Sequence, residues 1–122
     1  MIKGIVTANL HAELHLLVLG ARGKRRIRAI IDTGYNGWLT LPPTIIAELG
    51  LTWQEKGSAD LADGSETTFD IFAGQIVWNR RKQFIPVDEA VITPLVGTGL
   101  LENHKLVAEF REGGEVTITP LS

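Results

Sequence analysis

The chain has 122 residues, 44 % of them hydrophobic, with a net charge of -2 at pH 7 and no cysteine. This length predicts a single domain, residues 1–122, with a core that needs neither disulfides nor a structural metal. The lack of cysteine excludes disulfide frameworks, thiolate metal sites and cysteine nucleophiles. The small net charge gives no general attraction to nucleic acid or to anionic membranes.

The N-terminal residues and the hydropathy of the chain indicate its location. Met1–Gly4 lacks a basic segment followed by an apolar stretch, so we expect no secretory signal. No apolar run reaches the roughly 20 residues that a membrane-spanning helix needs. We therefore expect a cytoplasmic protein with no membrane partner.

The first third of the chain predicts a β-hairpin that leads to an acidic residue. Apolar and polar residues alternate over Val6–Val18, which is the period of one half-buried strand. Gly20–Lys24 is a turn with two glycines, and Arg26–Ile31 is the returning strand. Asp32 therefore stands where that strand ends.

The remaining chain predicts further strands and one or two short helices. Two prolines lead into Thr44–Gly50, where proline favours the first helical turn and Gly50 favours a left-handed C-terminal cap. The pair Asp63-Gly64 predicts a tight hairpin turn. Other expected elements are a hairpin turning at 79–82, a short helix within 97–104, and strands at 105–110 and 115–119. The sum is an all-β domain, a closed or partly closed barrel with short helices.

Two short motifs carry the chemical information. Asp32-Thr33-Gly34 follows the apolar pair Ile30-Ile31, and a second element, Leu95-Val96-Gly97, comes later and precedes Leu100-Leu101. A carboxylate on a sharp turn at a strand end is presented to solvent, where it can act on a substrate. The Asp-Thr-Gly motif occurs once in the chain.

In these residues the chain resembles the retropepsin-like aspartic proteases, in particular their small single-lobe prokaryotic members. The resemblance rests on four elements in the expected order, namely 30–34, the 41–51 segment, Asp63-Gly64 and 95–97. It implies the closed retropepsin-like (acid protease) barrel and an aspartic endopeptidase. It implies no cofactor and no metal.

The resemblance also implies a role for each residue of the first motif. Asp32 is the catalytic carboxylate, and Thr33 hydrogen-bonds across a dimer axis. Gly34 lets its backbone N–H approach the carboxylates, where a side chain would clash. Tyr35 and Asn36 then border a substrate-binding subsite. An aromatic residue at Tyr35 departs from the small residue that is commoner among retropepsins.

The other matching elements are assigned in the same way. Asp63 and Gly64 tip a flap that closes over an extended substrate and help to bind it. Leu95, Val96 and Gly97 pack behind the catalytic loop as structural support.

Aspartic-protease chemistry requires two carboxylates, and this chain supplies one. The two groups lie about 3 Å apart and share one proton across a water molecule. The remaining aspartates have no following Thr-Gly, namely Asp60, Asp63, Asp70 and Asp88. The resemblance therefore implies a symmetric homodimer that acts on an extended peptide or unfolded protein with apolar residues around the cleaved bond. The sequence does not identify the interface strands, and residues 115–121 are one candidate.

Three other interpretations compete with the protease. A dimeric peptide-binding or scaffolding module would keep the fold without catalysis. His11, Glu13 and His15 suggest a metal site, but on one strand the two histidines lie about 13 Å apart. The cationic runs 22–28 and 80–82 suggest nucleic-acid binding, yet no aromatic residues are interleaved with them. We therefore expect no metal and no nucleic acid.

Overall fold

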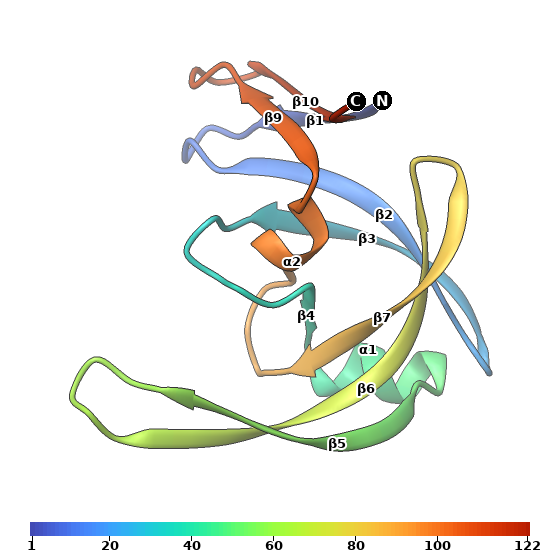
Figure 1. The fold of residues 1–122 in the computed structure, drawn as a ribbon. Helices are drawn as coiled ribbons and strands as arrows, with labels where there is room; N and C mark the ends of the chain where they lie inside the picture. The colour runs from blue at the N-terminus through green and yellow to red at the C-terminus, as the bar shows by residue number, and fades with distance from the viewer.

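The computed structural model describes residues 1–122 as ten strands and two short helices (Figure 1). The strands are β1 (Ile2–Val6), β2 (Ala12–Gly20), β3 (Gly23–Ile31), β4 (Leu39–Leu41), β5 (Thr52–Asp60), β6 (Glu66–Trp78), β7 (Arg81–Glu89), β8 (Leu95–Val96), β9 (His104–Ala108) and β10 (Glu115–Pro120). The helices are α1 (Pro43–Leu49) and α2 (Thr98–Leu101). Neither helix is long and apolar enough to cross a membrane.

Six strands close into a barrel. They pair in the order β2, β3, β8, β4, β7 and β6, and β6 pairs back to β2 through Leu17↔Val77 and its neighbours. Strand β5 extends the sheet beyond β6, while β1, β10 and β9 extend it beyond β2. This arrangement confirms the prediction of an all-β closed barrel with two short helices.

The barrel is filled by aliphatic side chains from strands on all sides. Val18, Leu39, Ile76, Val87 and Val96 have no exposed surface and belong to one core cluster. Burying a side chain of this size contributes about 1.5–3 kcal/mol. Ile46 and Leu49 of α1 and Leu100 of α2 join the same cluster, so the core fixes the strand ends and both helices.

Helix α1 and the later hairpins follow the sequence predictions closely. Pro43 begins α1, and Gly50 ends it with a left-handed backbone at φ 65°. Ile46 and Leu49 bury one face of the helix. The β6–β7 hairpin turns at Asn79 and Arg80, as expected.

The prediction of one strand over Val6–Val18 is wrong. Strand β1 ends at Val6, the chain turns, and β2 begins at Ala12 and pairs antiparallel with β1. The turn is closed by Thr7 N–H donating to the His11 carbonyl, and Leu10 has φ 63°. The alternation of apolar and polar residues continues through this turn, so the period alone did not reveal the reversal.

Strand β10 lies between β1 and β9 and is paired along both edges. Its backbone is therefore not free to pair with a second copy, so an interface through residues 115–121 would be formed by side chains. The free edge in this part of the sheet is β9.

Candidate active site

Backbone hydrogen bonds hold Asp32 directly after β3. Ile30 and Ile31 pair in parallel with Leu95 and Val96 of β8. Asp32 N–H then donates to the Val96 carbonyl at 2.9 Å. The half-buried Asp32 side chain accepts a hydrogen bond from Gly34 N–H, also at 2.9 Å. A Cβ at position 34 would lie 3.2 Å from that same carboxylate oxygen. The Gly34 N–H therefore orients the carboxylate, and the Asp32 N–H holds the start of the loop to β8.

Strand β8 lies between β3 and β4, the two strands that the Asp32 loop joins. The loop is fastened to the residues after β8: Gly97 N–H donates to the Trp38 carbonyl at 3.1 Å, and Thr98 N–H donates to the Tyr35 carbonyl at 2.8 Å. A Cβ at Gly97 would collide with the Gly37 carbonyl and lie 2.6 Å from the Tyr35 carbonyl. The structure thus brings Leu95-Val96-Gly97 directly behind the Asp32 loop.

Tyr35 links the loop to β7. Its hydroxyl donates to Oδ2 of Asp88 at 2.6 Å, and both side chains are half-buried. Burial raises the pKa of Asp88, and the hydrogen bond from Tyr35 lowers it in part. Burial, followed by the bond to Asp88, also raises the pKa of Tyr35. Asp88 pairs with Thr40 of β4 and with Ile71 of β6. Tyr35, the aromatic residue after Asp-Thr-Gly, therefore connects the Asp32 loop through Asp88 to strand β6 of the β5–β6 hairpin.

Sequence reasoning set Asp88 aside because it lacks a following Thr-Gly. Its contact with Tyr35 joins residues 53 positions apart. No local motif marks such a contact. The one available signal is a carboxylate at the end of the apolar strand 84–87.

The predicted hairpin turn at Asp63 and Gly64 is present. The hydroxyl and the backbone N–H of Ser65 both donate to Oδ1 of Asp63, which lowers the pKa of Asp63. Gly64 has φ 85°, a conformation that favours glycine. Figure 1 shows this β5–β6 hairpin projecting from the barrel, with its tip well away from the Asp32 loop. The structure does not bring Asp63 or Gly64 into contact with that loop.

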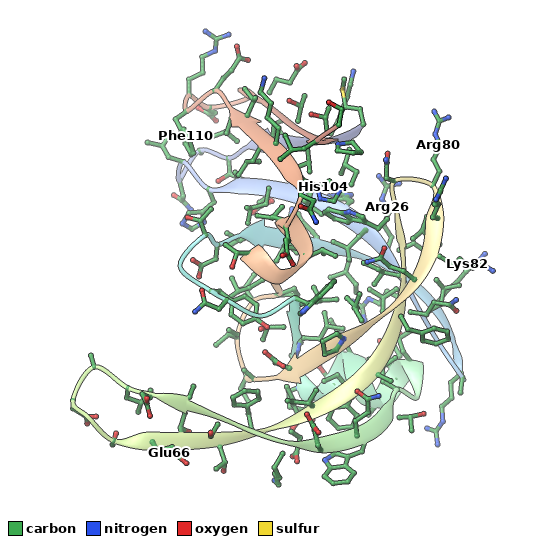
Figure 2. The ribbon with its side chains drawn as sticks, in the orientation of Figure 1. Arg26, Glu66, Arg80, Lys82, His104 and Phe110 are labelled. Atoms are coloured by element: carbon green, nitrogen blue, oxygen red, sulfur yellow. The ribbon has the colours of Figure 1, made fainter.

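The two faces of the β5–β6 hairpin differ in chemistry. On one face, a Cβ at Gly57 would lie 2.7 Å from the Phe69 ring and 2.8 Å from Ile71, so both side chains fold across the glycine. On the other face, Asp70 contacts Lys56 at 2.8 Å and Trp53 Nε1 at 3.0 Å, and both contacts lower its pKa. Glu66, near the tip in Figure 2, pairs with Asp60 across the strands. The hairpin thus carries an apolar cluster, Phe69 and Ile71 over Gly57, on one face and charged residues on the other.

An apolar pocket opens beside the Asp32 loop. Its volume is about 510 Å³, and it is lined by Leu10, His11, Ala12, Ile30, Ile31, Thr33, Leu106, Ala108 and Phe110. Leu10 is 53 % exposed and Phe110 is 66 % exposed. Figure 2 shows Phe110 at the outer end of the β9–β10 region. Asn36 is exposed and its side chain forms no hydrogen bond within the chain.

The two histidines near the N-terminus lie on different segments of the chain. His11 lies in the turn before β2, whereas His15 lies within that strand and accepts a hydrogen bond from Arg26. No group of three His, Asp or Glu side chains is placed to hold an ion.

Among solved structures, the chain is similar to a retropepsin-like aspartic protease from Rickettsia conorii. The match has 17 % sequence identity and a TM-score of 0.52, and it covers 98 % of this chain and 92 % of that chain. No family model matches the sequence, and no curated protein matches it. The structural match shows that the chain has a retropepsin-like all-β fold.

Proposed function

We propose that the protein is an aspartic endopeptidase that works as a homodimer. The observation that carries this proposal is the setting of Asp32. Its carboxylate lies on an Asp-Thr-Gly loop that β8 fastens from behind, at the end of a barrel strand in a retropepsin-like fold. This is the position where such a fold presents an acid to a substrate.

The chemistry needs Asp32 and the same aspartate of a second copy, one ionised and one protonated. The ionised carboxylate removes a proton from a water molecule, whose oxygen attacks the carbonyl carbon of the peptide bond. The protonated carboxyl donates its proton to the carbonyl oxygen. The carboxyl that took the water proton then passes it to the amide nitrogen, and the C–N bond breaks. A hydroxyl of the resulting acid returns its proton to the other carboxylate, so that the pair is again one ionised and one protonated group. Gly34 N–H keeps the carboxylate oriented throughout.

The apolar pocket beside Thr33 supports the second copy. A two-fold axis that brings two Asp32 carboxylates to about 3 Å must pass next to this loop. The second copy would therefore cover the surface formed by Thr33, Leu10 and Phe110, which is apolar and exposed in the single chain. Covering it removes apolar area from water and completes the catalytic pair in one step.

The substrate in this proposal is an extended segment of a peptide or unfolded protein. The β5–β6 hairpin acts as a flap, and its Gly57, Phe69 and Ile71 face closes over apolar side chains of the substrate. Tyr35 and Asn36 border the subsite next to the cleaved bond.

Digestion of a diverse peptide library, read by mass spectrometry, tests the proposal. Wild type, Asp32→Asn and the control Glu102→Gln, at an exposed carboxylate after α2, are compared at concentrations that favour a dimer. Cleavage by wild type and Glu102→Gln, but not by Asp32→Asn, is the expected result. Equal cleavage by all three would mean a contaminant. No cleavage by a confirmed dimer would favour the non-catalytic peptide-binding module instead.

A further inference from the structure

Strand β3 has one edge that is free over its first half. It pairs with β2 along its whole length, but with β8 only at Ile30 and Ile31. On the β8 side, Ile30 N–H donates to the Pro94 carbonyl. Backbone groups alternate sides along a strand, so those of Arg26 and Arg28 point to the same side as those of Ile30. Beyond Pro94 no strand of the protein meets them.

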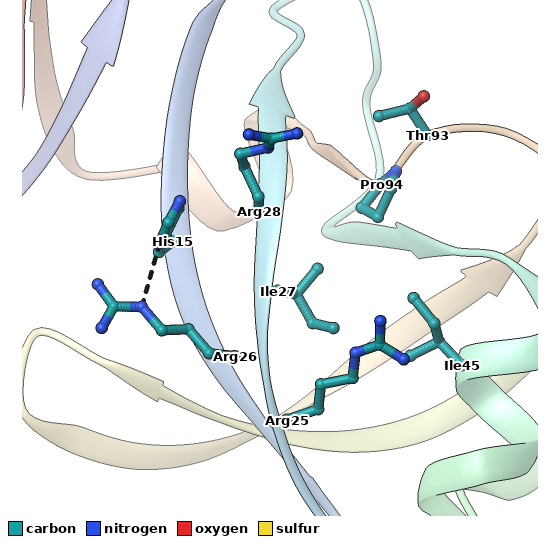
Figure 3. A pocket seen from close by; sticks show the side chains of 8 residues that line it. All are labelled: His15, Arg25, Arg26, Ile27, Arg28, Ile45, Thr93 and Pro94. Atoms are coloured by element: carbon teal, nitrogen blue, oxygen red, sulfur yellow. Dashed lines mark hydrogen bonds between the residues drawn. The ribbon is translucent and has the colours of Figure 1, made fainter.

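A groove runs along this free edge (Figure 3). Its volume is about 470 Å³, and its lining comes from β2, β3, α1 and the segment before β8. The lining residues are His15, Arg25, Arg26, Ile27, Arg28, Ile45, Thr93 and Pro94. The groove thus combines three guanidinium groups with apolar surface from Ile45 and Pro94, since Ile27 is only 3 % exposed, and its lining contains no carboxylate.

One of the three arginines has no acidic partner. Arg25 contacts Glu48 at 2.5 Å, and Arg28 contacts Glu13 at 3.5 Å. Arg26 forms no ion pair; its Nε donates to Nδ1 of His15 at 3.1 Å, shown dashed in Figure 3. Residues 22–28 hold five of the 12 Lys and Arg residues and no acid. A local excess of positive charge therefore lies along an unpaired strand edge.

We propose that this groove binds an extended acidic segment of another protein by strand addition to β3. The segment's backbone would pair with the free groups of Arg26 and Arg28. Its carboxylates would meet the Arg26 guanidinium, and intervening apolar side chains would lie on Ile45 and Pro94. The groove lining has no Phe, Tyr or Trp ring on which a nucleotide base could stack, and its one imidazole, His15, is hydrogen-bonded to Arg26, which favours a polypeptide over nucleic acid.

The competing explanation is that the arginines only protect the edge. Charged side chains on an edge strand discourage pairing between molecules. That explanation predicts no affinity for an acidic strand. Binding in the groove does not require catalysis at Asp32. The proposed protease activity and the proposed peptide binding can therefore be refuted independently of each other.

Fluorescence anisotropy on the Asp32→Asn protein tests the inference without cleavage of the probe. The probe is a labelled peptide with alternating Glu and Val, compared with its N-methylated form, with a Lys and Val peptide, and with a single-stranded oligonucleotide. We expect saturable binding of the Glu and Val peptide only. Arg26→Glu should weaken it about tenfold or more, while the matched control Arg80→Glu, in the β6–β7 turn, should leave it unchanged.

Several results would overturn the inference. An equal loss of affinity for the Glu and Val peptide in Arg26→Glu and Arg80→Glu would mean non-specific attraction of the peptide to cationic side chains. Equal binding of the N-methylated peptide would exclude strand addition. Tighter binding of the oligonucleotide would assign the groove to nucleic acid, and no binding of any probe would leave the arginines a purely protective role.

Discussion

Replacing Tyr35 by Phe removes the donor to Asp88 and little else. The hydroxyl donates to Oδ2 of Asp88 at 2.6 Å, between two half-buried side chains. Hydrogen bonds to charged groups contribute about 1.5–3 kcal/mol, and neutral ones about 0.5–1.5 kcal/mol. We therefore expect Tyr35→Phe to lower the free energy of unfolding by about 2 kcal/mol at neutral pH, where Asp88 is ionised.

The loss depends on pH in a defined direction. Burial raises the pKa of Asp88 above its ordinary value of 3.8, so the folded state binds this proton more tightly than the unfolded state. Asp88 therefore lowers stability as the pH rises through its folded pKa. The Tyr35 hydroxyl offsets part of this cost by stabilising the carboxylate. Once Asp88 is protonated in acid, the loss caused by Tyr35→Phe should shrink to about 1 kcal/mol.

Urea unfolding followed by tryptophan fluorescence measures the loss of unfolding free energy at neutral pH and in acid. Wild type and Tyr35→Phe are compared at about pH 4 and about pH 7, with and without Asp88→Asn as the control background. In that background the effect of Tyr35→Phe should no longer depend on pH. A loss that is equal at the two pH values in the presence of Asp88 would refute the reasoning.

Three further substitutions test other parts of the structure. Gly97→Ala places a methyl group against the Gly37 and Tyr35 carbonyls, so we expect a loss of about 1–3 kcal/mol in urea unfolding; a neutral result would contradict the close packing of the Asp32 loop on β8. Leu39→Ala empties a fully buried position in the barrel and should cost about 2–5 kcal/mol in the same assay; a loss below 1 kcal/mol would mean that β4 is not part of the core. Phe110→Asp should shift the monomer–dimer equilibrium toward the monomer, as measured by sedimentation equilibrium. The control Phe84→Asp, at another exposed phenylalanine (76 %), should leave this equilibrium unchanged. Equal effects of the two substitutions would mean that the pocket beside Thr33 is not part of the proposed interface.

The sequence predicted those elements whose ends carry local signals. Pro43 and Gly50 bound α1, and Asp63-Gly64 marks a hairpin turn, because each residue favours the backbone found there. The turn before β2 carried no such signal, since Leu10 adopts φ 63° although leucine rarely does so. The start of β5 also had no local signal, because residues 52–56 are exposed and apolar and polar side chains do not alternate there.

The candidate site was predictable to the extent that it is local. Asp32, Thr33 and Gly34 form a turn whose hydrogen bonds join near neighbours, and the sequence placed it correctly at a strand end. The contact of Tyr35 with Asp88 depends on how β7 packs beside β4, which no short motif encodes. The pocket beside Thr33 likewise gathers residues from three separate segments.

The position of β8 between β3 and β4 has a consequence for the order of folding. The hydrogen bond from Asp32 N–H to the Val96 carbonyl joins residues 32 and 96, so a growing chain cannot form it until most of its length has been made. Contacts between residues so distant in sequence form slowly, because a long loop must close first. A nascent or truncated chain that stops before Leu95 would contain all of Asp32-Thr33-Gly34 and still lack the strand that holds it. The acid therefore acquires its setting late in folding, when β8 pairs with β3 and β4 and the barrel closes.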